Sequence, residues 1–232
     1  SSRILHKLVN TKDYIEHPKK SGYRSIHLIY RYKNRKVRRY NELLIELQIR
    51  TKLQHVWATA VETVGTFIEH SLKSSEGPDD WLNFFALAGS GFAHLEKCSP
   101  VPGYEHQSAD ETFAAIEKEA VNLEVRDRLQ AFSIAANAIS NNEESGSHYY
   151  HLVVLDSAQK KVEIKSFARD RLDEANLNYA NTEKRIADGE PIQAVLVSAG
   201  PISTLKKAYP NYFLDTREFL KVLDKIKLNK KN

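Results

Sequence analysis

The stretches Gly22-Tyr-Arg-Ser-Ile-His-Leu-Ile-Tyr-Arg31 and Leu43-Leu-Ile-Glu-Leu-Gln-Ile-Arg50 decide the fold of the N-terminal part of this chain. Successive side chains of a strand point to opposite faces, and both stretches separate into two sets under that rule. In the second stretch one set is apolar: Leu43, Ile45, Leu47 and Ile49. The other set is polar: Glu42, Glu46, Gln48 and Arg50. We therefore expect a sheet with one buried apolar face and one polar face that carries chemistry.

The first stretch places its polar side chains in the same way. Alternation puts Tyr23, Ser25, His27 and Ile29 on one face. An aromatic ring and an imidazole would then lie beside the polar side chains of the neighbouring strand. Arg24 falls on the other face and Arg50 at the end of its strand, so we expect both to be structural or supporting residues.

Together with Lys12-Asp-Tyr-Ile15, Lys19 and Trp57-Ala-Thr-Ala-Val-Glu62, these stretches resemble the synthetase domain of the RelA/SpoT family over roughly residues 10 to 72. The resemblance implies an α/β (α+β) fold, namely a partial nucleotidyltransferase-like synthetase domain with a mixed sheet and flanking helices. It also implies a bacterial enzyme of the stringent response, a GTP/GDP diphosphokinase. Such an enzyme transfers pyrophosphate from ATP to the 3′ hydroxyl of GDP or GTP and so makes the alarmone (p)ppGpp.

The proposed reaction needs a metal-activated or deprotonated hydroxyl and charge neutralisation on the polyphosphate. The resemblance assigns Glu46 to catalysis and to Mg²⁺ binding. It assigns Tyr23 to stacking on guanine, a contact that is worth roughly 1–3 kcal/mol in nucleic-acid complexes. His27 and Gln48 would contact the acceptor nucleotide, and Gln48 offers both a donor and an acceptor. Glu62 would accept hydrogen bonds from guanine N1 and N2.

Two lysines complete the predicted nucleotide-binding set. By the resemblance, Lys12 lies on the ATP side and Lys19 near the acceptor diphosphate. The chain contains no methionine and begins directly before the motifs. We therefore expect the natural N-terminus, with the remaining ATP-site residues, to lie upstream, so that this chain carries the acceptor-side half of the site.

The segment between the two strands is basic. Arg31, Lys33, Arg35, Lys36, Arg38 and Arg39 lie within residues 31–39, beside Tyr32 and Tyr40. A solvated hairpin tip is the plain interpretation, whereas clustered cations with aromatics also indicate weak RNA contact. The segment leaves open a toxin-type pyrophosphokinase that acts on tRNA or adenine nucleotides. A second alternative is a non-catalytic nucleotide-binding regulatory protein that has lost the ATP half of the site.

Composition sets the remaining limits. The chain has 232 residues, 41% hydrophobic content and a formal net charge of +4, which is typical of a soluble globular protein. No apolar run reaches the length of about 18 residues that a spanning helix needs, so no membrane association is expected. The one cysteine, Cys98, excludes an internal disulfide and suits the cytoplasm. Composition leaves a homo-oligomer open.

Prolines and glycines that interrupt helical periodicity divide the chain into predicted domains. Apolar periodicity predicts helices over 51–73 and 81–96, and Pro100, Pro102 and Gly103 then interrupt the helical pattern. We predict a synthetase domain over 1–100, a linker over 101–109 and a small α/β accessory domain over 110–232. In that domain we expect helix over 110–137, strands over 148–156, 161–167 and 192–198, and helices over 171–188 and 216–227.

Overall fold

The computed structural model describes residues 6–68, 72, 76–132, 149–156, 161–198 and 212–229. Its first sheet has the order β1 (Lys7–Asp13), β2 (Ile26–Arg31) and β3 (Leu44–Ile49). Its second has the order β5 (Lys161–Phe167), β4 (Tyr150–Asp156) and β6 (Ile192–Ser198). The α+β class is therefore confirmed. The expected mixed sheet is wrong for the described strands, because every pair is antiparallel.

Two of the five α-helices whose bounds the structure describes begin at side-chain caps. The five helices are α1 (Lys52–Phe67), α2 (Asp79–Glu96), α3 (Ala109–Asn122), α5 (Leu172–Ala187) and α7 (Tyr212–Asn229). Thr51 and Gln54 form a capping box before α1, and Ser108 and Glu111 form another before α3. In each box two orphan N–H groups of the first turn gain side-chain acceptors. No helix in the described part of the chain is long and apolar enough to cross a bilayer.

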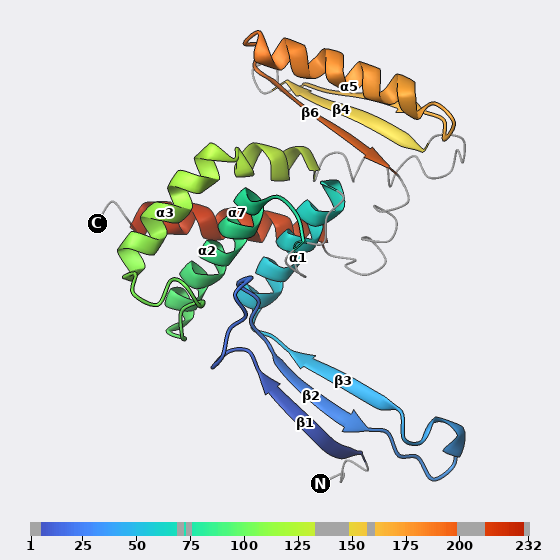
Figure 1. Ribbon diagram of the computed structural model, residues 1–232, viewed down its shortest axis with the longest axis vertical. Helices are drawn as coiled ribbons and strands as arrows, with labels where there is room; N and C mark the ends of the chain where they lie inside the picture. Colours follow the sequence, from blue (N-terminus) through green and yellow to red (C-terminus); the bar gives the residue numbers. More distant parts are fainter. Residues whose placement is uncertain are drawn as a thin grey trace.

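The main hydrophobic core lies among the helices. It joins buried side chains of α1, α2, α3, α7 and the helical stretch 125–132, and it includes Val153, Val195 and Val197 of the second sheet. Figure 1 shows α7, near the C-terminus, lying against α1 and the first sheet extending away from one end of the helices. A smaller cluster of Leu152, Phe167 and Ala175 holds α5 on the second sheet.

The boundary predicted at 101–109 does not coincide with a break in this core. Val101 is fully buried, and its N–H donates to Ser90 Oγ of α2 at 3.3 Å. Helices α3 and α7, both from the predicted accessory domain, pack against α2 and α1. The division of the chain into two domains therefore stays a prediction.

The apolar face of the first sheet is exposed, which corrects the expectation that it is buried. The four apolar side chains of the second strand stretch keep between 41% and 57% of their surface exposed: Leu43, Ile45, Leu47 and Ile49. Register pairs Leu47 with Leu28 and Ile49 with Ile26, so the alternation itself was predicted correctly. None of the described helices covers this face, because their apolar stripes pack on one another.

A glycine turn joins the first sheet to the helices. Gly22 adopts a φ of +91°, and a Cβ there would lie 2.7 Å from the carbonyl oxygen of Phe85 in α2. Across the same contact, a Cβ on Gly89 of α2 would lie 2.7 Å from Gly22 Cα. The turn and the helix therefore meet backbone to backbone, which only glycine permits.

We expect Gly22→Ala to lower the free energy of unfolding by about 2–5 kcal/mol. Left-handed φ costs a residue with a Cβ about 1–2 kcal/mol, and the clash with α2 adds about 1–3 kcal/mol. Gly103→Ala is the matched control, because Gly103 also has positive φ (+100°) but nothing lies within 4 Å of its Cβ position. Urea unfolding of both variants measures the difference. Equal losses would show that the contact with α2 contributes nothing.

Candidate functional site

The polar face of the first sheet brings four predicted site residues together. Antiparallel register places His27 opposite Gln48 on one side and opposite Lys12 on the other. Glu46 lies opposite Ile29, and these two residues form the next cross-strand pair on the same face. Gln48 Nε2 donates to Glu46 Oε1 at 3.0 Å. Lys12, His27, Glu46 and Gln48 therefore share one face of the sheet, whereas their roles stay predictions.

Tyr23, His27 and Glu46 form a continuous polar chain. The Tyr23 hydroxyl lies 2.7 Å from His27 Nε2, and the other ring nitrogen, Nδ1, contacts Glu46 Oε1. A hydrogen from the Tyr23 hydroxyl to Nε2 leaves Nδ1 as the nitrogen that carries the proton. The imidazole thereby links an aromatic hydroxyl to the carboxylate. Sequence alternation placed Tyr23 and His27 on one face but did not predict the bond between them, since Tyr23 precedes the first residue of β2.

Burial lowers the pKa of His27 below its usual value of 6.5. The negative charge of Glu46 opposes this effect, and the positive charges of Arg50, Lys19 and Lys12 reinforce it. The imidazole is therefore neutral at pH 7. A neutral ring can accept a hydrogen bond at one nitrogen and donate at the other, as the contacts with Tyr23 and Glu46 require.

Arg50 belongs to the site, although we expected it to be a structural or supporting residue. One of its terminal nitrogens donates to the Tyr23 hydroxyl at 2.9 Å and to Gln48 Oε1 at 2.5 Å. Its guanidinium carbon lies 5.3 Å from the centre of the Tyr23 ring, and Lys19 Nζ lies at the same distance from it. Lys19 is also 4.8 Å from the Tyr14 ring. Two cations therefore contact the aromatic residue predicted to bind guanine.

Tyr23 itself is buried, with 3% of its surface exposed. Its ring makes edge contacts with Tyr14, His27 and Trp57 at centroid separations of 5.9, 5.7 and 6.4 Å. The predicted stacking face is therefore covered in this structure. Stacking of Tyr23 on guanine stays a prediction, and it requires a covering side chain to move.

Glu96, at the C-terminal end of α2, anchors the loop that carries Tyr23. Its carboxylate accepts a hydrogen bond from Arg24 at 2.6 Å and another from Gln54 of α1 at 3.3 Å, and it also contacts Thr51. The Arg24 side chain is only 2% exposed. Arg24 is thus a supporting residue, as expected, but sequence reasoning missed Glu96 because it lies 72 residues further along the chain.

Glu62 is half-buried in α1, and the neighbouring Val61 is in the core with 1% exposure. Glu62 lies five positions after Trp57, whose ring contacts Tyr23. At about 100° per residue Glu62 therefore lies roughly 140° around the helix axis from Trp57. Its part in base recognition stays a prediction.

One oxygen of Glu46 suits a divalent cation. Both recorded contacts of this carboxylate go to Oε1, so Oε2 has no partner among the described residues. That part of the chain contains no group of three or more acidic, His or Cys side chains that could hold a metal. Mg²⁺ commonly takes one or two protein carboxylates and completes its shell with substrate phosphates and water. Glu46 fits the first of those roles.

Comparison with known proteins supports the assignment of this region. Residues 2–69 match the region found in RelA and SpoT proteins. A stretch of 65 residues is 43% identical to the GTP pyrophosphokinase YjbM of Bacillus subtilis (strain 168). Residues 2–69 are therefore similar to the RelA/SpoT region. The matched stretch makes up 28% of this chain and 27% of that relative, so the similarity covers about a quarter of its length.

Two solved structures are also similar to this chain. The small alarmone synthetase 1 of B. subtilis, bound to its product pppGpp, is 29% identical over 41% of this chain and 47% of its own, with a TM-score of 0.35. A GTP pyrophosphokinase family protein of Streptococcus pneumoniae is 26% identical over 56% of this chain and 53% of its own, with a TM-score of 0.28. The similarity to RelA/SpoT proteins therefore rests on the sequence of residues 2–69.

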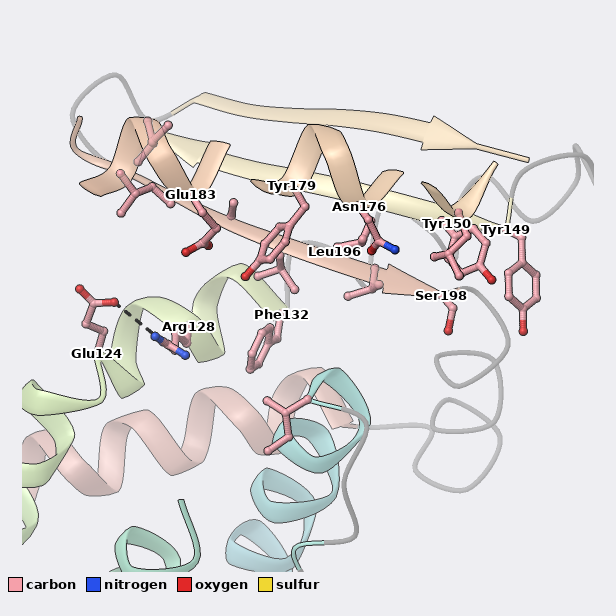
Figure 2. A pocket seen from close by; sticks show the side chains of 17 residues that line it. Glu124, Arg128, Phe132, Tyr149, Tyr150, Asn176, Tyr179, Glu183, Leu196 and Ser198 are labelled. Carbon is pink, nitrogen blue, oxygen red and sulfur yellow. Dashed lines mark ion pairs between the residues drawn. The ribbon is translucent and has the colours of Figure 1, made fainter. Parts of the chain in front are cut away.

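A second hollow lies apart from the RelA/SpoT region. It is a cavity of about 770 Å³ between α5, β6 and the stretch 125–132. Figure 2 shows the side chains that line it. Its charged groups bond to one another: Arg128 pairs with Glu124 at 3.8 Å, and Tyr179 bonds to Glu183. Burial, together with that bond, raises the pKa of Tyr179 to about 12. None of the predicted site residues lines this cavity.

We expect the pKa of His27, measured by NMR titration, to lie below 6.5 and to fall further in Glu46→Gln. Glu46 is the carboxylate whose charge raises this pKa, so its neutralisation removes the stabilisation of the imidazolium. Lys12→Met should shift the pKa upward, because it removes a cation. Glu42→Gln is the control, since Glu42 pairs with Arg31. A rise in Glu46→Gln would contradict the contact between His27 and Glu46.

Proposed function

We propose that this chain carries the acceptor-nucleotide half of a (p)ppGpp synthetase, which transfers pyrophosphate from ATP to the 3′ hydroxyl of GDP or GTP. The observation that supports this function most directly is the contact of Glu46 with a neutral His27 on the polar face of a RelA/SpoT-family sheet. A carboxylate in that setting is fixed in position and remains accessible. Its side chain is 42% exposed.

In this proposal the two carboxylate oxygens of Glu46 have different roles. Oε1 is held by His27 and Gln48, which fixes the orientation of the carboxylate. Oε2 then faces the acceptor ribose and orients the 3′ hydroxyl or accepts its proton. The ribose oxygen attacks the β-phosphate of ATP, the bond from the β-phosphorus to the oxygen bridging to the α-phosphate breaks, and AMP leaves. Mg²⁺, held by the same carboxylate and the substrate phosphates, would lower the charge on the polyphosphate. Positioning and electrostatics supply most of the catalysis in phosphoryl transfer.

The cations around His27 provide the complementary charge for an acceptor diphosphate. Lys12, Lys19 and Arg50 all act on the pKa of His27, which places their charges near the same point. Within the described residues, no carboxylate forms an ion pair with Lys19 or Arg50. A nucleotide bearing two or three phosphates would supply that missing negative charge.

Base recognition falls to Tyr23, Gln48 and Glu62 in this proposal. Tyr23 would stack on the guanine ring, Gln48 would bond near the acceptor guanosine, and Glu62 would accept from N1 and N2. Adenine lacks that pair of donors, so the carboxylate would favour guanine.

The function is tested by incubating the full-length protein, which would include the ATP-site residues expected upstream, with labelled ATP, Mg²⁺ and one acceptor at a time: GDP, GTP, AMP or tRNA. We expect label on GDP or GTP. Calorimetry with GDP tests the acceptor half separately, because it requires no ATP. Absence of GDP binding to the 232-residue chain would reject the acceptor site.

We expect Glu46→Gln to reduce pyrophosphate transfer by at least 100-fold while GDP affinity and the unfolding midpoint change little. The substitution removes the charge that faces the metal and the 3′ hydroxyl but keeps the size of the side chain. Glu42→Gln on the adjacent hairpin should stay within threefold of wild type, because Glu42 pairs only with the exposed Arg31. Transfer by Glu46→Gln within tenfold of wild type would remove Glu46 from the mechanism.

The basic hairpin distinguishes a small acceptor from tRNA. Arg35, Lys36, Arg38 and Arg39 are all exposed, and Arg39 stacks on Tyr40 at 4.6 Å. We expect their joint replacement by Ser to leave alarmone synthesis within twofold and to weaken only salt-dependent RNA binding, because extended phosphate contacts release many counterions. Gel-shift and synthesis assays over a salt series measure both effects. Efficient tRNA labelling by wild type that the variant loses would favour the tRNA acceptor.

A further inference from the structure

Lys19 and Arg50 cover the ring of Tyr23, and they differ from its other neighbours. Trp57 belongs to helix α1, His27 to strand β2 and Tyr14 to the loop after β1. Trp57 and His27 are buried. Lys19 is exposed and Arg50 half-exposed, and both reach the ring through long flexible side chains. The two cations are therefore the parts of the cover that can move without unfolding the site.

Neither Lys19 nor Arg50 has all of its hydrogen-bond donors satisfied by the contacts that hold it beside the Tyr23 ring. Arg50 Nε is buried and has no hydrogen-bond partner among the described residues, although the terminal nitrogen of the same guanidinium bonds Tyr23 and Gln48. Lys19 contacts the Tyr14 and Tyr23 rings. A cation over an aromatic face is attracted modestly, whereas a cation beside a phosphate forms a much stronger charge-assisted bond. An anion entering the site would therefore draw both side chains from the ring.

We propose that Lys19 and Arg50 act as a cation cover on Tyr23, which the phosphates of the acceptor remove so that the ring can then receive the base. The proposal rests on the acceptor site proposed above and adds two specificity-determining residues to it. Phosphate binding and base binding become coupled: a nucleoside without phosphates must displace the cations with no compensating bond, whereas a nucleotide displaces them with its own charge.

This coupling has a signature that a simple phosphate contact lacks. If Lys19 only bound phosphate, its removal would weaken GDP and leave guanosine unchanged. If Lys19 stacked on the bound base, its removal would weaken both ligands. Under the cation cover its removal weakens GDP and strengthens guanosine. By the reciprocity of linked binding, inorganic pyrophosphate should also raise the affinity of wild type for guanosine.

The experiment measures guanosine and GDP binding to the 232-residue chain by ligand-observed NMR and calorimetry, in wild type, Lys19→Ala and Lys20→Ala. We expect Lys19→Ala to bind guanosine about three- to fivefold more tightly and GDP about tenfold more weakly than wild type. Lys20 is the adjacent exposed lysine, so Lys20→Ala should bind both within twofold. Saturating pyrophosphate should tighten guanosine binding severalfold in wild type and not in Lys19→Ala, with sodium chloride matching the ionic strength.

Two failures are distinguishable. If wild type binds GDP but Lys19→Ala binds guanosine no better than wild type, the cation cover is overturned and the acceptor site stands. Competition between pyrophosphate and guanosine, in place of cooperation, overturns the cover equally. If wild type does not bind GDP, the acceptor site and the cover fall together. Because Lys19 is exposed, its substitution should leave the unfolding midpoint unchanged, which circular dichroism verifies.

Discussion

The backbone contact between Gly22 and Gly89 is the constraint on which the candidate site depends. It leaves no room for a Cβ on either residue, so the turn before β2 is seated directly on helix α2. Tyr23 and Arg24 follow immediately, and Arg24 reaches Glu96 at the end of the same helix. Two anchors on one rigid element fix the position of Tyr23 and, through its hydroxyl, that of His27. The chemistry on the sheet therefore relies on a helix outside the matched RelA/SpoT region.

Sequence periodicity predicted most of the elements because their patterns are local. Strands β5 and β6 have the predicted bounds, and α2, α5 and α7 differ from prediction by a few residues at their ends. Strand β1 was missed. Its sequence Lys7-Leu-Val-Asn-Thr-Lys-Asp13 has no apolar alternation, and it pairs with β2 through a bulge between Leu8 and Asn10. The burial of the sheet was also predicted wrongly, since alternation identifies an apolar face and not what covers it.

Only the part of the candidate site that lies on one face of the strands could be predicted from the sequence. Alternation along each strand placed His27, Glu46 and Gln48 on one face, because side chains of directly paired residues on neighbouring strands point to the same side of the sheet. Arg50 was assigned a supporting role, since its position at a strand end gave no sign that it would bond to Tyr23. Glu96 could not be found at all. Its partner Arg24 lies in another element, and only the tertiary packing of α2 brings the two charges together.

In the proposed mechanism, the buried imidazole would hold the accessible carboxylate of Glu46 in position without removing its charge. A protonated His27 would neutralise Glu46 and compete with a metal for it, whereas burial and the surrounding cations keep the ring neutral. A neutral ring orients Oε1 without taking its charge, so the full negative charge remains for the open Oε2. The same cations that keep His27 neutral are the ones an anionic acceptor would engage.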